Sequence, residues 1–211
     1  LARQHGLVIF SDEIYDKILY DDAKHTSIAS LADDVFFVTF SGLSKNYRVA
    51  GFRAGWLLVS GNKRLASDYI EGLNILSSMR MCANVPCQSA IQTALGGYQS
   101  INDLVNENGR LRIQRDVTTD MLNGIDGIHC VKPKGAMYCF ARVDEKKFNI
   151  HNDEQMILDL LSSEKILLVH GKAFNLNSGI YFRLVFLPHS DVLVPALHRI
   201  GNFFRTYKQG A

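Results

Sequence analysis

The sequence predicts an α/β fold in two parts, the remainder of a large α/β domain followed by a small α+β domain. Near the start, continuous β-branched and aromatic runs such as LVIF and VFFVTF end in polar residues, which is typical of buried sheet strands. From about residue 128, short strand-like runs alternate with amphipathic helical segments. We expect the two domains to occupy residues 1–105 and 106–211.

The first half opens on a helix end that stops at Gly6 and enters a strand. Three apolar runs are expected to be strands buried on both faces of a sheet: 7–15, 35–42 and 54–62. The segments that follow have apolar residues every three or four positions and predict helices. These helices are expected to break at Pro86, at Gly96 with Gly97, and at Gly124.

The second half begins with two predicted strands within residues 128–143, around Pro133, Lys134 and Gly135. Two further strands are expected in ILLVHG and IYFRLVF. Helices are expected after Asn152 and after Ser190, each of which is a favourable N-cap residue. Strands and helices in this order indicate a compact α+β unit.

Composition limits the class of protein. The 211 residues carry a net charge of +2 without basic runs, so nothing favours nucleic acid or an anionic membrane, and the expected partner is a small molecule. The longest apolar runs are far shorter than the ~20 residues of a membrane-spanning helix. The chain starts without methionine or a signal peptide, so we expect a piece of a longer, cytoplasmic protein.

The cysteines give no sign of a metal site or a disulfide framework. They do not form a C-x-x-C pair, and no histidine stands at zinc-finger spacing from them. We therefore expect no bound metal and reduced, buried thiols at Cys82, Cys87, Cys130 and Cys139.

A loop rich in polar residues follows the second apolar run. Lys45 alone would be read as an ordinary solvated lysine, but Arg53 stands eight residues further on, and Ser41 and Ser44 add hydroxyl groups. A guanidinium, an amine and hydroxyls on flexible backbone suit a phosphate group. The alternative is that Arg48 and Arg53 are surface charges on a turn.

Asp12 and Tyr15 follow the first apolar run. An aspartate at the carboxyl end of a buried strand lies where open α/β sheets bind ligands, and Tyr15 is near enough to reach the same ligand. Alternatively, Asp12 caps the next segment and Tyr15 packs on it. Together with Lys45 and Arg53, however, these are the four side chains that pyridoxal phosphate chemistry requires.

Two motifs carry a resemblance to a known family. DEIY at 12–15 and GLSKNYRVAGFRAGW at 42–56 resemble fold-type-I pyridoxal-phosphate enzymes, the aspartate aminotransferase-like superfamily of class I/II. SDEIYDKILYDD, SMRMCANVPCQSAIQTALGGYQSI and KPKGAMYCF are similar to bacterial members that act on alanine. The likeness covers nearly the whole chain. It implies transfer of an amino group from L-alanine to 2-oxoglutarate, giving pyruvate and L-glutamate.

The resemblance implies a role for each residue. Lys45 would form the Schiff base with pyridoxal 5'-phosphate and move the substrate proton, while Asp12 would pair with the pyridinium nitrogen. Tyr15 would bind the phenolic oxygen, and Arg53 the phosphate. It also implies a homodimer in the full-length protein, with the chain inactive on its own because upstream residues complete the site.

The loop departs from the family pattern at two positions. Many relatives have a phosphate-binding serine three residues before the lysine, where this chain has Gly42. We therefore assign the hydroxyl contact to Ser44, with Ser41 or a backbone amide as alternatives. Arg48 stands where a small or apolar residue is commoner, and it either supports the phosphate site or faces solvent.

Arg183 interrupts the apolar run IYFRLVF. A charge in an apolar strand is costly without a partner, which favours burial beside an anion. The resemblance implies that Arg183 binds the substrate α-carboxylate. The alternative is an arginine on an edge strand that faces water.

Other functions remain open at this level. The same residues serve β-lyases, racemases, decarboxylases, and aromatic or aspartate aminotransferases, because the surrounding protein selects the bond that breaks. Aminotransferase-like domains also act as ligand-sensing modules of transcription regulators, without turnover. Formation of a keto acid without release of ammonia would favour transfer.

Overall fold

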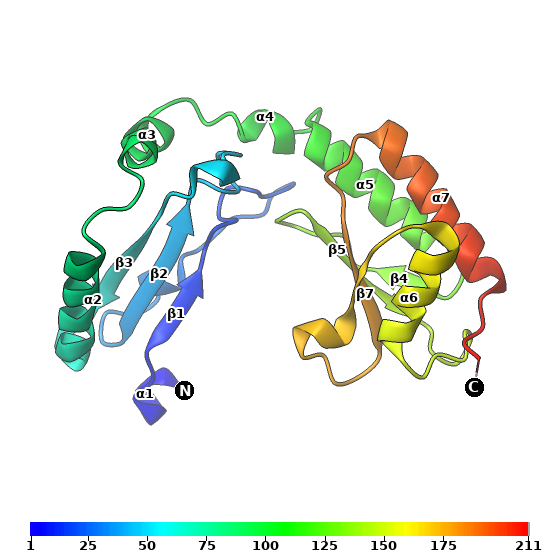
Figure 1. Cartoon of the computed structure of the whole chain (residues 1–211), viewed down its shortest axis with the longest axis horizontal. Coiled ribbons are helices and arrows are strands. Elements are labelled where there is room, and N and C mark those ends of the chain that lie inside the picture. The colour runs from blue at the N-terminus through cyan, green and yellow to red at the C-terminus, as the bar shows by residue number, and fades with distance from the viewer. Residues whose placement is uncertain (211) are drawn as a thin grey trace. The chain divides into compact units, whose positions relative to one another are not determined.

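The computed structural model describes residues 1–210, which form two compact units. The first unit is Leu1–Asn102, and the second begins at Asp103 (Figure 1). The assignment of 1–105 to a cofactor-binding domain and of 106–211 to a small domain stays a prediction.

The first unit contains a three-stranded sheet of β1 (Ile9–Asp12), β2 (Phe36–Gly42) and β3 (Gly55–Gly61), in the order β1-β2-β3. β1 runs parallel to β2, with Asp12 opposite Phe40, and β3 runs antiparallel to β2 (Figure 1). The carboxyl ends of β1 and β2 therefore meet at one edge of the sheet.

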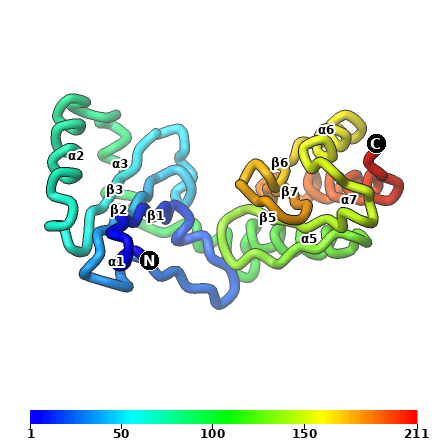
Figure 2. Tube along the Cα trace, turned by 90° about the horizontal axis from the view of Figure 1, so that it is seen from below, coloured from blue at the N-terminus to red at the C-terminus, as the bar shows by residue number. Residues whose placement is uncertain are grey.

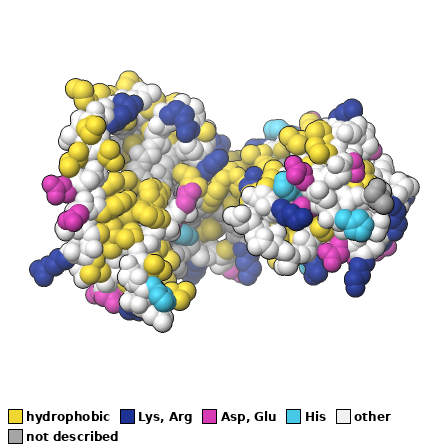
Figure 3. Space-filling view, turned by 60° about the horizontal axis from the view of Figure 1, so that its bottom comes forward, with side chains coloured by type: hydrophobic (Ala, Val, Ile, Leu, Met, Phe, Trp, Pro, Cys, Tyr) yellow, Lys and Arg dark blue, Asp and Glu magenta, His cyan; other side chains and the backbone are white. Residues whose placement is uncertain are grey.

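The three predicted strands are present, but the prediction that all are buried on both faces is wrong. Phe36, Phe37 and Val38 of the central strand are buried. Phe10 of β1 is 57% exposed, although its ring lies 6.0 Å from that of Tyr69 in the later segment 67–80, and Leu58 of β3 is 59% exposed. Figure 3 shows hydrophobic side chains gathered on the surface of this unit, at the left.

The helices of the first unit form around the predicted breaks. α2 (Ser67–Arg80) is followed by α3 (Val85–Gly96). Pro86 lies in the first turn of α3, where the missing N–H of proline costs no hydrogen bond within the helix. Short elements complete the unit: α1 (Ala2–His5), η1 (Ile28–Ser30), η2 (Ala50–Phe52) and η3 (Lys63–Ala66). Neither α2 nor α3 buries a residue among the described ones. α4 (Asn102–Val105) spans the division between the units.

The second unit contains an antiparallel sheet of four short strands in the order β4-β5-β7-β6. These are β4 (Ile128–Cys130), β5 (Tyr138–Val143), β6 (Val169–His170) and β7 (Ile180–Val185). α5 (Arg110–Asn123) and α7 (Ser190–Thr206) lie side by side, and α6 (Asp153–Glu164) packs near β6 and β7 (Figures 1 and 2). Cys139 and Phe182 face the buried core, whereas Phe140 and Arg183 point to the other face of the sheet.

Of the two predicted N-cap residues, one is confirmed and one is wrong. Asn152 caps α6 by accepting hydrogen bonds from the amides of Glu154 and Gln155, as predicted. Ser190 does not cap α7: it is the first helical residue, and His189 occupies the cap position without a side-chain bond.

All four cysteines are free thiols. Cys130 and Cys139 are buried as expected, but Cys82 is exposed and Cys87 is partly exposed, because the segment around α2 and α3 buries nothing. Within residues 1–210, no helix has the length and apolar character needed to cross a bilayer.

Candidate active site

Asp12 and Tyr15 lie where β1 gives way to a turn. Asp12 is the last residue of the strand, and its exposed Oδ1 accepts a hydrogen bond of 3.2 Å from the amide of Ile14. This local bond holds the carboxylate at the strand end. Tyr15 is half-buried on the following turn.

Lys45 lies in the loop that follows β2. The loop is closed by a bond of 3.0 Å from the Leu43 amide to the Ala54 carbonyl, and a turn brings the Arg48 amide to the Lys45 carbonyl. Nζ of Lys45 lies 5.9 Å from the centre of the Tyr15 ring. Within residues 1–210, this amine has no hydrogen bond or ion pair, so it is available for a ligand.

A cavity of about 330 Å³ gathers four of the predicted cofactor-binding residues. Its lining comprises Asp12, Ile14, Phe40, Ser41, Ser44, Lys45, Ala50 and Arg53. Both serines that were considered as hydroxyl donors are therefore present at the same cavity. A carboxylate, an amine, a guanidinium and two hydroxyls converge here although the sequence separates Asp12 from Arg53.

The two arginines of the loop differ in position. Arg53 adopts a left-handed conformation with φ of 52°, and its Nη1 donates to the Ala50 carbonyl at 2.7 Å, which directs the side chain along the cavity wall. Arg48 is exposed and donates to Oγ of Ser100 at 2.6 Å. Arg48 does not line the cavity, which favours the interpretation that it faces solvent.

The space around Gly42, three residues before Lys45, is restricted. Gly42 lies opposite Gly55 in the β2–β3 pair. A Cβ on Gly42 would lie 3.0 Å from the Ala54 carbonyl oxygen and 3.0 Å from Cα of Gly55. The two strands approach too closely at this point for a side chain without a local shift.

Hydrogen bonds join the turn after β1 to the loop after β2, and these contacts were not predicted from the sequence. Asn46, which is 2% exposed, donates to Oδ1 of Asp16 at 2.5 Å. Lys17 donates to the hydroxyl of Tyr47 at 3.0 Å. Asp16 and Asn46 directly follow Tyr15 and Lys45, so their bond fixes the two loops against each other. Only that adjacency could have indicated the pair in the sequence.

Glu13 anchors a second segment to the end of β1. Its carboxylate accepts bonds from the hydroxyls of Ser11 and Ser27 and from the Ile28 amide, and Nε2 of His25 lies 2.9 Å away. Burial raises the pKa of Glu13, but bonds from His25, Ser27, Ser11 and Ile28 outweigh burial and leave that pKa below its usual value. Glu13 therefore ties residues 25–28 to the strand that carries Asp12.

Arg183 lies on β7 of the second unit, opposite Phe140 of β5 and Val169 of β6. β7 has a neighbour on each side, so the alternative of an edge-strand arginine is wrong. Cζ of Arg183 lies 4.6 Å from the centre of the Tyr138 ring and 4.5 Å from that of Phe174. Its buried Nε has no hydrogen-bond partner within residues 1–210, which leaves a donor for an anion.

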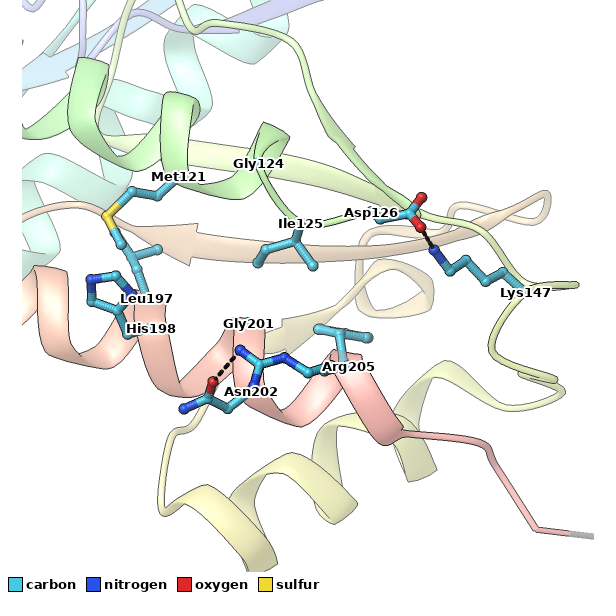
Figure 4. A pocket seen from close by; sticks show the side chains of 11 residues that line it. Met121, Gly124, Ile125, Asp126, Lys147, Leu197, His198, Gly201, Asn202 and Arg205 are labelled. Carbon is cyan, nitrogen blue, oxygen red and sulfur yellow. Dashed lines mark hydrogen bonds and ion pairs between the residues drawn. The ribbon is translucent and has the colours of Figure 1, made fainter.

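A separate cavity of about 510 Å³ in the second unit contains none of the predicted residues. It lies between the end of α5 and α7 (Figure 4). Asp126 pairs with Lys147 there, and Arg205 bonds to Asn202. These polar groups pair with one another, and His198 is the remaining titratable side chain of the lining.

The strand-end aspartate and the loop lysine line one cavity, in keeping with the resemblance of their motifs to aminotransferases of class I and II. Residues 1–200 match aminotransferase class I and II, and the chain belongs to that family.

Two individual proteins are similar to the chain over almost its whole length. The chain is 58% identical over 209 residues to glutamate-pyruvate aminotransferase AlaA of Haemophilus influenzae, covering 99% of this chain and 52% of that protein. It superposes on the crystal structure of an aminotransferase from Escherichia coli with a TM-score of 0.96 and 56% identity, covering 99% of this chain and 52% of that one.

A more distant structure supports the same fold. The aspartate aminotransferase from Rhizobium meliloti matches with a TM-score of 0.82 and 26% identity, covering 96% of this chain and 51% of that one. The predicted aspartate aminotransferase-like fold is confirmed. The chain spans about half the length of the curated relatives it matches.

Proposed function

We propose a function for a protein that contains this chain and is as long as its relatives. This full-length protein transfers the amino group of L-alanine to 2-oxoglutarate with pyridoxal 5'-phosphate. The observation that carries this proposal is the cavity where Lys45, Asp12, Ser44 and Arg53 converge. The likeness to glutamate-pyruvate aminotransferase AlaA supports the choice of substrates.

The donor set suits this cofactor. Arg53 and Ser44 offer a guanidinium fork and a hydroxyl to a phosphate, and the Asp12 carboxylate offers a negative charge to a ring nitrogen. The Lys45 amine, which has no hydrogen bond or ion pair within residues 1–210, would condense with the aldehyde carbon, whose oxygen leaves as water. Tyr15 lies beside Lys45, where its hydroxyl would serve the phenolic oxygen.

When bound, pyridoxal phosphate accepts the electron pair that remains after a proton leaves the substrate Cα. Asp12 would keep a proton on the ring nitrogen, which would make that acceptance favourable. Once the incoming amino acid displaces the Lys45 amine, Nζ would take the proton from Cα and deliver it to the former aldehyde carbon of the cofactor. In this proposal Lys45 carries the proton, and Asp12 provides the fixed negative charge.

Both substrates present an α-carboxylate, and we propose that Arg183 binds it. The unpartnered Nε and the planar guanidinium suit two parallel hydrogen bonds to one carboxylate. The rings of Tyr138 and Phe174 flank the cation, so its hydrogen-bonding edge remains for the substrate.

The reaction itself is tested with the full-length protein. We expect pyruvate to form from alanine beyond one equivalent per active site only when 2-oxoglutarate is present, in equal amount to glutamate over these repeated turnovers and without ammonia. Coupled assays for pyruvate and for ammonia measure this outcome. Release of ammonia would instead indicate a lyase, and no turnover with cofactor bound would indicate a ligand-sensing domain.

Arg183→Lys is expected to raise KM for alanine and for 2-oxoglutarate by about tenfold or more, because a point charge replaces a planar fork poorly. The cofactor content should stay unchanged. Steady-state kinetics with each substrate varied separately provide the measurement, and the exposed Arg142 of β5 provides the control variant Arg142→Lys. Unchanged KM values would place the carboxylate elsewhere.

We also propose that the full-length protein is a cytoplasmic homodimer. The exposed apolar side chains of the first unit, such as Phe10, Leu57 and Leu58, offer a surface for further protein contacts.

A further inference from the structure

A buried carboxylate lies next to the turn that follows β6. Asp153 is fully buried at the start of α6, although the cap position of this helix already belongs to Asn152. Its Oδ2 accepts a bond of 2.9 Å from the Lys172 amide and lies 3.6 Å from Nδ1 of His170. A buried charge needs such partners, so Asp153 fixes the backbone where the turn begins.

The turn is η4 (Gly171–Phe174), and its position leaves little freedom. A Cβ on Gly171 would lie 3.0 Å from Cβ of Tyr181, so the backbone packs directly on β7. Asn175 ends the turn in a left-handed conformation. Phe174 is thereby delivered to the sheet, with its ring edge-on to Phe140 at 5.7 Å.

The guanidinium of Arg183 contacts two aromatic rings, those of Tyr138 and Phe174. Tyr138 belongs to β5, and Phe174 is the last residue of η4, the turn that follows β6; β5 and β6 flank β7 on opposite sides. The two ring centres lie 4.6 and 4.5 Å from Cζ of Arg183. Cation–π contacts from both neighbours restrict rotation of the guanidinium and fix the direction of its hydrogen-bonding edge.

We infer that Phe174 is a positioning residue for the carboxylate-binding Arg183, and that Asp153 holds Phe174 in place through the turn. The inference rests on the proposed function, since it concerns the same carboxylate. Without the ring, the guanidinium would sample several orientations, and the substrate would have to order it on binding.

Phe174→Leu tests the contact, because Phe174 is 42% exposed and leucine preserves apolar volume there. In the full-length enzyme, we expect KM for alanine and 2-oxoglutarate to rise about fivefold to tenfold with kcat unchanged. Phe174→Tyr, which keeps the ring, should restore both KM values. Equal KM values in wild type and Phe174→Leu would overturn the inference.

The anchor is tested with Asp153→Ala beside Glu154→Ala, an exposed carboxylate in the same helical turn. Asp153→Ala should reproduce the KM increase of Phe174→Leu, whereas Glu154→Ala should not. The thermal midpoint of unfolding shows whether Asp153→Ala is stable enough for kinetic assays. If it is not, Phe174→Leu and Phe174→Tyr still decide the role of Phe174. A folded Asp153→Ala with wild-type KM values would remove Asp153 from the inference.

Succinate, which cannot be transaminated, gives a readout independent of turnover. Its Kd, measured by calorimetry, should rise with Phe174→Leu but not rise further when this change is added to Arg183→Lys, because both act on one contact. If Arg183→Lys alone changes neither Kd nor KM, the proposed carboxylate site fails, and this inference with it. If Arg183→Lys weakens binding while Phe174→Leu does not, only the positioning role is overturned.

Discussion

Lys45→Ala is expected to abolish both transamination and covalent attachment of the cofactor in the full-length protein. The Lys45 amine lines the cavity and has no hydrogen bond or ion pair within residues 1–210, so it is available to react. Among residues 1–210, no other lysine lines this cavity. The measurement is mass spectrometry after borohydride reduction, which should show the cofactor on the peptide containing residue 45 only in the wild type.

Two control variants separate chemistry from charge. Lys45→Arg keeps a positive charge but lacks the reactive amine, so it should lose turnover as completely as Lys45→Ala. Lys63→Ala removes an exposed lysine of the same unit and should behave as wild type. A reduced cofactor adduct in Lys45→Ala, with the fold intact by circular dichroism, would contradict the assignment.

Much of the fold could be predicted from the sequence because local patterns determine it. The continuous apolar runs gave β1, β2 and β3, and the cap preference of Asn152 located α6. The burial of β1 and β3 could not be predicted, since it depends on what covers the sheet rather than on the strand itself. Ser190 shows the same limit, because a suitable residue caps a helix only if the chain enters at the right point.

The candidate site divides in a similar way. Asp12 and Lys45 could be predicted because each follows an apolar run and matches a family motif. The bond between Asp16 and Asn46, and the contact between Phe174 and Arg183, depend on pairing between distant segments. No spacing in the sequence indicates such contacts. The residues proposed to touch a ligand were therefore easier to predict than those proposed to position them.

Asp12→Asn is expected to slow turnover by about 10²- to 10³-fold, the loss typical when a fixed charge partner is removed. An amide cannot hold a proton on the ring nitrogen as a carboxylate does, so removal of the substrate proton becomes slower. The fold should survive, because asparagine can still accept the hydrogen bond from the Ile14 amide. The measurement is the single-turnover rate with Cα-protiated and Cα-deuterated alanine, together with cofactor content.

The prediction separates catalysis from binding because Arg53, Ser44 and Lys45 remain to hold the cofactor. A cofactor methylated on its ring nitrogen carries the positive charge permanently, so it should restore part of the rate to Asp12→Asn. Asp22→Asn, at an exposed position of the same unit, is the matched control. If Asp12→Asn removes the substrate proton at the wild-type rate, Asp12 serves only to cap the turn after β1, and the electron-withdrawing charge must come from another group.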